Sequence, residues 1–321
     1  MKTALVLGAS GRFGRNMAIA LRARGWTVRN FRRGEDRLED AARGVALIVN
    51  AWNPPYPRWA FEVPQLHADV RRIARATGAT VLIPGNVYGF GQQPQMPWRE
   101  GTPQLATGSL GRIRLEMERA YERDGVRTII LRAGDFIDTE MSDNWLDRVI
   151  LSKLAKGRII WPGDPDVPHA WAYLPDMARA AVDLVENSAN LDTFSTVHFP
   201  GYTLSGREIG DLAGAALGTS LEVRRMAWWP LQIARPVWPM ARYLLQMRYL
   251  WSLPHALASD RFDNLLPGFQ STPPEVAIAA AVAAIEGKAM SAQTRPWRPA
   301  SGLDGQTIPA SVTIRLDEGK T

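Results

Sequence analysis

Three glycines near the start of the chain have a spacing that suits diphosphate binding. Gly8, Gly11 and Gly14 follow the apolar run Ala4–Leu7 and precede residues with helical periodicity. Glycine lets a phosphate approach the bare backbone, and free N–H groups at the start of a helix attract anions. We therefore predict a dinucleotide-binding turn, whose expected contact residues are Gly8, Ser10, Gly11, Arg12, Phe13 and Gly14. A tight strand-to-helix turn without a ligand is the alternative interpretation.

A pair of arginines bears on which dinucleotide would bind. Arg32 and Arg33 follow the expected strand Trp26–Phe31, and no carboxylate appears before Glu35. In dinucleotide-binding folds an acidic side chain at this place binds the ribose 2′-hydroxyl, whereas an arginine accommodates a 2′-phosphate. A guanidinium can also stack on the adenine. The sequence therefore favours NADP(H) over NAD(H), with a solvated basic loop as the alternative.

The expected third strand, Ala46–Asn50, ends in further candidate cofactor contacts. Asn50, Ala51 and Trp52 stand at its carboxyl end. The small Ala51 would let the adenine side of a cofactor pass closely. Trp52 either flanks the cofactor or fills a gap between strand and loop.

These residues need a sheet whose strand ends meet at one edge. Strand and helix patterns alternate over the first 190 residues, which is typical of a parallel sheet covered on both faces. Ligands of such sheets lie outside the carboxyl ends of the strands. The expected strands are Thr3–Leu7, Trp26–Phe31, Ala46–Asn50, Thr80–Ile83, Thr128–Leu131, Arg158–Trp161 and Thr196–Phe199, and the expected helices are Pro64–Thr77, Thr107–Arg123, Asp176–Glu186 and Glu275–Gly287.

The regular alternation of strand and helix patterns ends in the second half of the chain. We expect a doubly wound, Rossmann-type α/β lobe over residues 1–165, with 171–200 adding its last helix and strand. A smaller substrate lobe over 201–288 and a loosely packed tail over 289–321, with a short strand at Ser311–Leu316, would follow. The stretch from 221 to 270 is rich in Trp, Pro, Arg and Leu. It is either a roof over the substrate site or a membrane-surface element, and its prolines favour the roof because they interrupt a long amphipathic face.

The composition limits the classes of function. With 321 residues the chain can bury a large core in two lobes. The absence of cysteine excludes disulfides and thiolate metal sites, and the four histidines show no ligand spacing, so we expect no metal. Lys2 leads straight into a strand, so we expect no signal peptide, no stable membrane insertion and a cytoplasmic location.

The net charge of +6 comes from a chain in which arginine is by far the commonest basic residue. Only two tight arginine groups occur, one at Arg29, Arg32 and Arg33 and one on an expected helix. Nucleic-acid binding needs a continuous basic face, so no nucleic-acid partner is expected. We expect a small-molecule substrate and leave a homodimer open.

Several stretches together resemble a known superfamily. They are Gly8–Gly14, Asn50–Ala51, Pro84–Gly89, Arg132–Phe136 and Tyr173–Ala178, in an order and at separations that fit along residues 1 to about 287. The chain in this respect resembles the extended or atypical short-chain dehydrogenase/reductases, and within them the NAD-dependent epimerase/dehydratase group. The resemblance implies a Rossmann lobe, a smaller substrate lobe, and cofactor contacts from Pro84, Gly85, Asn86 and Phe136.

The chain departs from this family in its catalytic residues. The resemblance implies a Ser or Thr at the end of the fourth strand, where Pro84 stands. It also implies a Tyr-x-x-x-Lys pair on the next long helix, in which the tyrosine exchanges a proton and the lysine holds the nicotinamide ribose. No such pair exists here. Arg112 or Arg114 could replace the lysine. Gly108 or Leu110 would then stand at the tyrosine position, and neither can exchange a proton.

Other residues are candidates for the missing chemistry. Tyr88 follows the fourth strand, and Arg114 is a cation that could lower its phenol pKa. In the family a tyrosine at this place is mainly structural, which is the alternative. His169 lies in an expected loop, 163–171, over the pocket, where it is either a general acid or a hydrogen-bond partner within the loop. Asp135 is interpreted as a cap or loop-forming residue.

We therefore predict an NADP(H)-binding, epimerase- or reductase-like oxidoreductase for a small carbonyl or sugar-like substrate. Its candidate catalytic residues are Tyr88, His169 and Arg114. A non-catalytic NADP(H)-sensing or assembly protein of the same fold is the alternative, because the Tyr-x-x-x-Lys pair is missing.

Overall fold

The structure is a computed structural model that describes residues 2–93 and 95–291, with the side chains of 288–291 left aside. The statements below concern this part of the chain. The strand expected at Ser311–Leu316 lies outside it, as does most of the expected tail.

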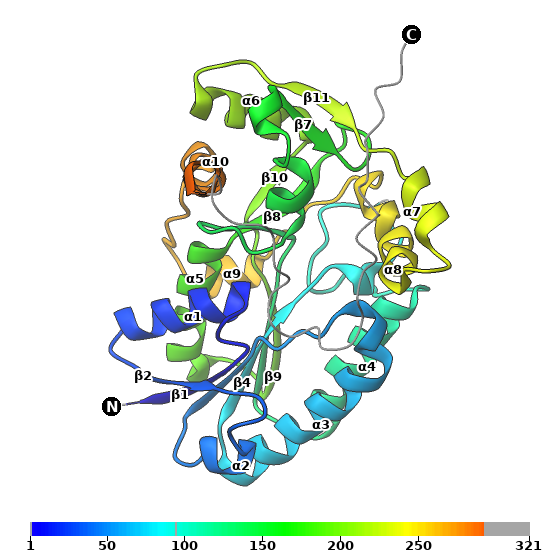
Figure 1. Cartoon of the computed structure of the whole chain (residues 1–321). Coiled ribbons are helices and arrows are strands. Elements are labelled where there is room, and N and C mark those ends of the chain that lie inside the picture. The colour runs from blue at the N-terminus through cyan, green and yellow to red at the C-terminus, as the bar shows by residue number, and fades with distance from the viewer. Residues whose placement is uncertain (1, 94, 292–321) are drawn as a thin grey trace.

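A sheet of six parallel strands forms the centre of the molecule, as predicted (Figure 1). Its strands are β1 (Thr3–Leu7), β2 (Thr27–Phe31), β3 (Leu47–Asn50), β4 (Thr80–Gly85), β5 (Thr128–Arg132) and β9 (Phe194–His198), in the spatial order β2-β1-β3-β4-β5-β9. The chain runs from β1 outward to β2 and then crosses to β3 on the other side of β1. In doubly wound sheets such a reversal opens a crevice at the carboxyl ends of the two strands on either side of it.

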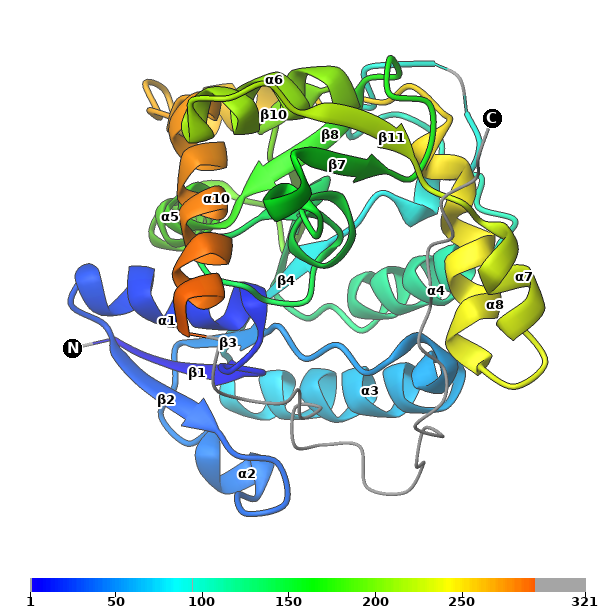
Figure 2. The same ribbon diagram turned by 45° about the horizontal axis from the view of Figure 1, so that its top comes forward.

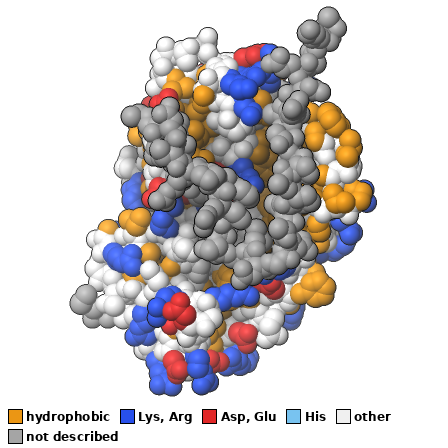
Figure 3. Space-filling model, viewed as in Figure 1, with side chains coloured by type: hydrophobic (Ala, Val, Ile, Leu, Met, Phe, Trp, Pro, Cys, Tyr) orange, Lys and Arg blue, Asp and Glu red, His pale blue; other side chains and the backbone are white. Residues whose placement is uncertain are grey.

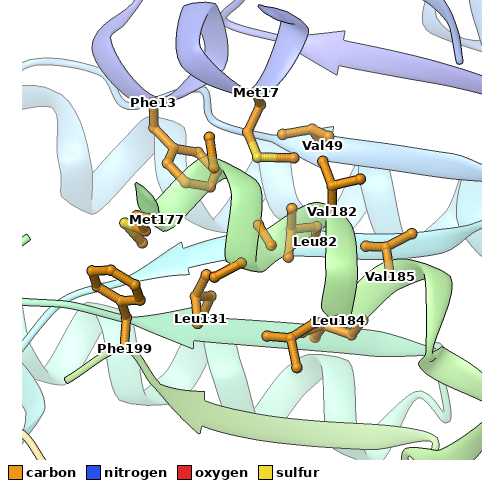
Figure 4. Close-up of a cluster of buried hydrophobic side chains, with 14 of the residues drawn as sticks. Phe13, Met17, Val49, Leu82, Leu131, Met177, Val182, Leu184, Val185 and Phe199 are labelled. Carbon is orange, nitrogen blue, oxygen red and sulfur yellow. The ribbon is translucent and has the colours of Figure 1, made fainter. Parts of the chain in front are cut away.

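Helices cover both faces of this sheet. Helices α1 (Arg12–Ala23) and α5 (Leu174–Glu186) pack together on one face, and α3 (Trp59–Thr77) and α4 (Ser109–Arg123) pack together on the other. Successive strand residues alternate between two apolar clusters, since Ala4 and Val6 join the α1–α5 side while Leu5 and Leu7 join the α3–α4 side. Figure 4 shows the first of these clusters, into which Phe13 and Met17 project from α1.

Two smaller sheets lie beyond the carboxyl ends of the central strands (Figure 2). One contains β6 (Asp135–Ile137), β8 (His169–Tyr173) and β10 (Tyr202–Leu204), and the other pairs β7 (Arg158–Trp161) with β11 (Glu222–Arg225). Helices α6 (Gly206–Leu217) and α10 (Pro274–Ser291) pack against each other beside them. The loop expected at 163–171 is therefore wrong in its last part, because His169 begins a buried strand that pairs with β10 on one side and with β6 on the other.

The tryptophan-rich segment forms short helices. They are α7 (Trp229–Ala234), α8 (Pro239–Met247) and a 3-10 turn at Arg248–Trp251, followed by α9 (Asp260–Leu265). Helix α8 contacts the 3-10 turn Tyr56–Arg58, which follows β3. The remaining short elements are α2 (Leu38–Ala41), 3-10 turns at Tyr88–Phe90, Leu154–Lys156 and Ser188–Asn190, and a π-helical turn at Leu146–Ile150. Within the described ranges, no helix combines the length and apolarity needed to cross a bilayer.

Candidate dinucleotide site and catalytic crevice

The glycine turn between β1 and α1 has the shape of an anion cradle. Gly8 adopts a left-handed φ of 77°, and its carbonyl accepts a hydrogen bond from the N–H of Gly11 at 2.9 Å. A Cβ on Gly14 would lie 2.2 Å from the Gly8 oxygen, so only glycine lets α1 begin this close to the turn. A Cβ on Gly8 would lie 3.0 Å from the carbonyl oxygen of Ala51. The turn thus lies directly against the exit of β3.

The first turn of α1 presents unsatisfied N–H groups beside this turn. Its cap residue Gly11 supplies no side-chain acceptor, and the first turn contains no acidic residue. The positive end of the helix dipole is therefore not neutralised locally. Arg12 turns its side chain away to the carbonyl groups of Ser142 and Asp143, so its backbone N–H, with that of Phe13, is what remains for an anion.

The two arginines after β2 lie at the surface beside the crevice. Arg32 forms ion pairs with Glu35 at 2.7 Å and Asp36 at 3.6 Å. The guanidinium of Arg33 lies 4.5 Å from the ring centroid of Trp52, and it pairs with Glu62 at 3.6 Å. Arg33 and Trp52 thus form a cation–π contact at the exit of β3.

Other predicted cofactor residues lie at the strand ends, but their side chains differ in direction. The Asn50 amide nitrogen lies 3.2 Å from Nδ1 of buried His67, on the α3 side, and the buried amide oxygen of Asn50 has no hydrogen-bond partner. Pro84 and Gly85 end β4, where a Cβ on Gly85 would lie 2.8 Å from Ile130. Phe136 of β6 packs, half-buried, against the same apolar cluster as Ala9 and Ala51. The side-chain oxygen of Asn86 accepts the N–H of Tyr88 at 3.1 Å.

That Asn86 turn positions a pair of tyrosines. The hydroxyl oxygens of Tyr88 and Tyr56 are 2.6 Å apart, and either can donate. Burial raises the pKa of Tyr88 well above its usual value, and the neighbouring Tyr56 and Asp135 add to this rise. The charge of Arg114 lowers the pKa of Tyr88, as the sequence suggested, but burial outweighs it. Tyr88 is therefore a proton donor at neutral pH and not a ready base.

Arg114 is a buried cation at the same place. Its Nη2 donates to the side-chain oxygen of Asn53 at 3.2 Å, and its guanidinium lies 4.7 Å from the ring centroid of Trp59. Its Nε has no hydrogen-bond partner, and no carboxylate of the described chain lies within ion-pair distance. Burial lowers the pKa of Arg114. A buried guanidinium with an unused N–H is typical of a site that awaits an oxygen-bearing ligand.

His169 does not lie over the pocket. Its ring is stacked on Trp251 with centroids 4.3 Å apart, and only 2% of the residue is exposed. Its Nε2 lies 2.7 Å from Oδ2 of Asp135, whose side chain is 30% exposed. The group that reaches solvent is therefore Asp135, and His169 would act on a substrate only through it. Asp135 is more than a loop-forming residue, because β6 places it between His169 and the tyrosine pair.

A small cavity lies beside Tyr88, which is the one member of these groups that lines it. It has a volume of about 140 Å³ and is lined by residues of the Tyr88 turn, the start of α4 and the end of α8, among them Tyr88, Gly108, Gly111, Met247 and Tyr249. Leu110, at one of the two candidate tyrosine positions, is fully buried in the apolar cluster under α4. The chemistry at this cavity thus falls to Tyr88 and its neighbours.

Sequence reasoning missed Tyr56, Asn53 and Asp135 as members of the site. Tyr56 and Asn53 follow β3 closely, so their position after a strand end was the one available signal. Their pairing with Tyr88 and Arg114 joins residues far apart in the chain and has no local pattern.

The strand order and the glycine turn together define a doubly wound α/β fold of the dinucleotide-binding type. No protein-family model matches the sequence, and no curated protein matches it. Solved structures do match over 89% of this chain. MoeE5 in complex with UDP-glucose and NAD is 14% identical, with 99% of its chain covered and a TM-score of 0.70. The UDP-N-acetylglucosamine 4-epimerase from Bacillus cereus is 14% identical, with 100% covered and a TM-score of 0.69.

WbmH from Bordetella bronchiseptica, in complex with NAD+, is 17% identical, with 98% of its chain covered and a TM-score of 0.67. At these identities the similarity establishes the fold. The doubly wound α/β fold that the sequence predicted is thereby confirmed.

Proposed function

We propose that this protein is an NADP(H)-dependent oxidoreductase, epimerase- or reductase-like, that acts on a small carbonyl or sugar-like substrate. The observation that carries the proposal is the uncapped start of α1 against Gly8, which lies at the same edge of the parallel sheet as the turns after β3 and β4 that carry Tyr56 and Tyr88. The related folds bind NAD together with UDP-glucose or NAD+ alone, which supports a nicotinamide dinucleotide and a carbohydrate-like substrate here.

The residues present fit such a cofactor. The N–H groups of Arg12 and Phe13 would hold its diphosphate, and Gly8 and Gly14 leave the space that a Cβ would fill. Arg114 occupies one of the two candidate lysine positions, where its free Nε–H would bond a ribose hydroxyl. When bound, the nicotinamide would supply or accept the hydride.

The protein's own contribution is a proton. Tyr88, whose raised pKa keeps it protonated, donates its O–H to the carbonyl oxygen of the substrate as that oxygen gains negative charge. The Tyr56 hydroxyl, whose oxygen lies 2.6 Å from that of Tyr88, then returns a proton to Tyr88 and is itself reprotonated from solvent. Asp135 and His169 are a second pair of groups through which protons could be supplied.

The preference for the 2′-phosphate form rests on Arg33 and Arg32. The cation–π contact of Arg33 with Trp52 holds a guanidinium at the exit of β3. The pair of Arg32 with Glu35 is exposed and contributes little, so a phosphate can displace that carboxylate. The long 3.6 Å pair of Arg33 with the half-buried Glu62 leaves the Arg33 guanidinium able to take a second partner.

Titration calorimetry with NADPH and NADH tests this proposal. We expect NADPH to bind roughly tenfold or more tightly than NADH, since a bidentate guanidinium–phosphate pair is strong. The Arg32→Asp, Arg33→Ser double variant should narrow that gap. The Arg37→Asp, Arg43→Ser variant is the matched control, because both its arginines are exposed beside Asp40 near α2. Equal affinity for the two dinucleotides would contradict the NADP preference.

A non-catalytic NADP(H) sensor remains the second candidate, and the burial of Leu110 in the core favours it. Single-turnover NADPH oxidation with a panel of aldehydes and ketones separates the two. The oxidoreductase requires turnover that Tyr88→Phe reduces by roughly a hundredfold while NADPH affinity is kept. Tight NADPH binding without turnover on any carbonyl would establish the sensor.

A further inference from the structure

One segment of the chain is basic throughout. Between Glu222 and Asp260 there is no acidic residue, while Arg224, Arg225, Arg235, Arg242 and Arg248 all occur. This segment contains α7 and α8, which lie together at one edge of the molecule (Figure 2). Most surfaces of soluble domains carry charges of both signs. A segment of this length with arginines and no carboxylate therefore favours binding of an anionic partner.

The same segment exposes large apolar side chains. Trp229, Ile233, Val237 and Trp238 have exposed fractions between 39% and 85%. The first three are spaced four residues apart, so they share one side of α7 and its continuation. The opposite side holds the segment to the body through buried Leu231. We call the four exposed residues the α7 ridge, and Figure 3 shows apolar atoms at this edge of the molecule.

A cavity of about 410 Å³ lies beside the α7 ridge, between α7, α8 and the start of α4. Arg112, Arg235 and Arg242 line it, together with Ser109, Gln232 and Gln246. None of the three arginines has a carboxylate within ion-pair distance in the described part of the chain, whereas most other exposed arginines that flank α1 or α3 do. The first turn of α4 has no acidic residue and no side-chain cap. The cavity therefore has arginines from α4, α8 and the end of α7 in its lining and has the size of a small-ligand site.

We propose that α7 and α8 form a docking surface for anionic phospholipid membranes, in which the arginine-lined cavity takes a phosphate headgroup and the α7 ridge enters the interface. Trp and aliphatic side chains on one side of a helix, with arginines beside them, match the chemistry of an interfacial element. Each cation near a membrane of negative surface potential adds to the attraction. The arginine-lined cavity adjoins the cavity at Tyr88, with which it shares Thr107 and Gln246, but the inference does not rest on the proposed enzymatic function.

A second copy of this chain fits the surface less well. In a two-fold interface the same patch faces itself, so Arg235 and Arg242 would meet further arginines. No carboxylate between 222 and 260 is present to compensate them. A phospholipid supplies the missing negative charge and the apolar phase at the same time.

Vesicle co-sedimentation of the full chain tests the proposal. We expect binding to vesicles of phosphatidylcholine with phosphatidylglycerol, weak binding to phosphatidylcholine alone, and release at high salt because screening weakens the attraction. Arg235→Glu with Arg242→Glu should reduce the partition coefficient roughly tenfold or more. Trp229→Ser with Ile233→Ser should also reduce it. The control, Arg37→Glu with Arg43→Glu, has the same change in charge at the α2 edge and should retain binding.

Three results would overturn the inference. Equal binding to neutral and anionic vesicles, or none to either, removes the role of the headgroup. Calorimetric binding of glycerol 3-phosphate that is lost in Arg235→Glu with Arg242→Glu, without vesicle binding, identifies a site for a free anion instead. A dimer that Trp229→Ser with Ile233→Ser converts to monomer, again without vesicle binding, identifies the ridge as a self-association surface. The substituted side chains are exposed, so unchanged thermal unfolding of each variant checks its folding.

Discussion

At the scale of single residues, the groups that we propose for catalysis come from several elements and not from one helix. Tyr88 comes from the turn after β4, Tyr56 from the turn after β3, and Arg114 from α4. The phenol pair is protonated at neutral pH, because burial raises the pKa of Tyr56 as well as that of Tyr88. A site of this kind can give a proton to an oxygen but is poorly suited to take one away. Reduction of a carbonyl therefore fits it better than oxidation of an alcohol.

Arg114 provides a prediction at this scale. Its charge is buried without a carboxylate partner, so the apolar Arg114→Met should leave the free energy of unfolding unchanged or raise it by about 1 kcal/mol. The same change should weaken NADPH binding roughly tenfold, because the unused Nε–H is lost. Urea unfolding and titration calorimetry measure the two effects separately.

Arg114→Lys is the matched variant, because it keeps the cation and restores the residue type that the family uses. It should recover part of the lost affinity. A large loss of stability in Arg114→Met, with NADPH affinity unchanged, would show that Arg114 is structural.

At the scale of elements, the local patterns predicted the first half of the fold well. The bounds of β1 are as expected, and α1 follows directly on the glycine turn, because alternation and glycine spacing are contained in adjacent residues. Helix α3 begins at Trp59 and not at Pro64, which lies inside the helix. A proline there removes one backbone hydrogen bond, so the rule that proline marks the start of a helix was misleading here. The strands β6, β8 and β10 were missed. Each is short and is held by partners remote in sequence.

A substitution at Gly14 tests how closely α1 must approach the turn after β1. Gly14→Ala places a methyl group 2.2 Å from the Gly8 carbonyl oxygen, which is backbone and cannot rotate away. We expect α1 to shift from the turn, with a cost of about 1–3 kcal/mol in unfolding free energy. NADPH affinity should fall as well, because the N–H groups of α1 move.

Gly101→Ala is the control for this change, since a Cβ on Gly101 meets nothing within 4 Å. Its unfolding midpoint and its NADPH affinity should equal those of the unchanged protein. If Gly14→Ala left both the unfolding midpoint and the NADPH affinity unchanged, the close approach of Gly14 to the Gly8 carbonyl would not be required by the fold.

At the scale of the whole molecule, the candidate site depends on contacts that no local pattern reveals. Asp135 and His169 are adjacent because β6 and β8 lie side by side in a separate small sheet. Arg132 pairs with Glu118 at 2.7 Å and donates to the Asn86 carbonyl at 2.6 Å, so β5, α4 and the Tyr88 turn are fixed to one another. The sequence could therefore place the candidate cofactor residues at strand ends and propose Tyr88 and Arg114, whereas Tyr56, Asn53 and Asp135 joined the candidate site only in the folded chain.

The four histidines supply the last prediction, which concerns the stability of the whole fold in acid. All four are buried. Burial lowers the pKa of His255 to about 3 and that of His198 to about 4, and it lowers the pKa of His67 as well. In the unfolded chain each titrates near 6.5. The unfolded state therefore binds more protons below this pH, and the stabilisation present above about pH 6.5 is lost as the pH falls toward these lowered values. At about pH 5, His198 and His255 should each cost about 2 kcal/mol of unfolding free energy.

Urea unfolding between about pH 7.5 and 5 measures the loss. His255→Gln keeps a donor for the Leu253 carbonyl but cannot titrate. Below about pH 6 the unfolding free energy of the unchanged protein should therefore fall more steeply than that of the variant, and the two slopes should differ by about 1.4 kcal/mol per pH unit. Parallel pH profiles for the variant and the unchanged protein would show that His255 is not held neutral by the fold.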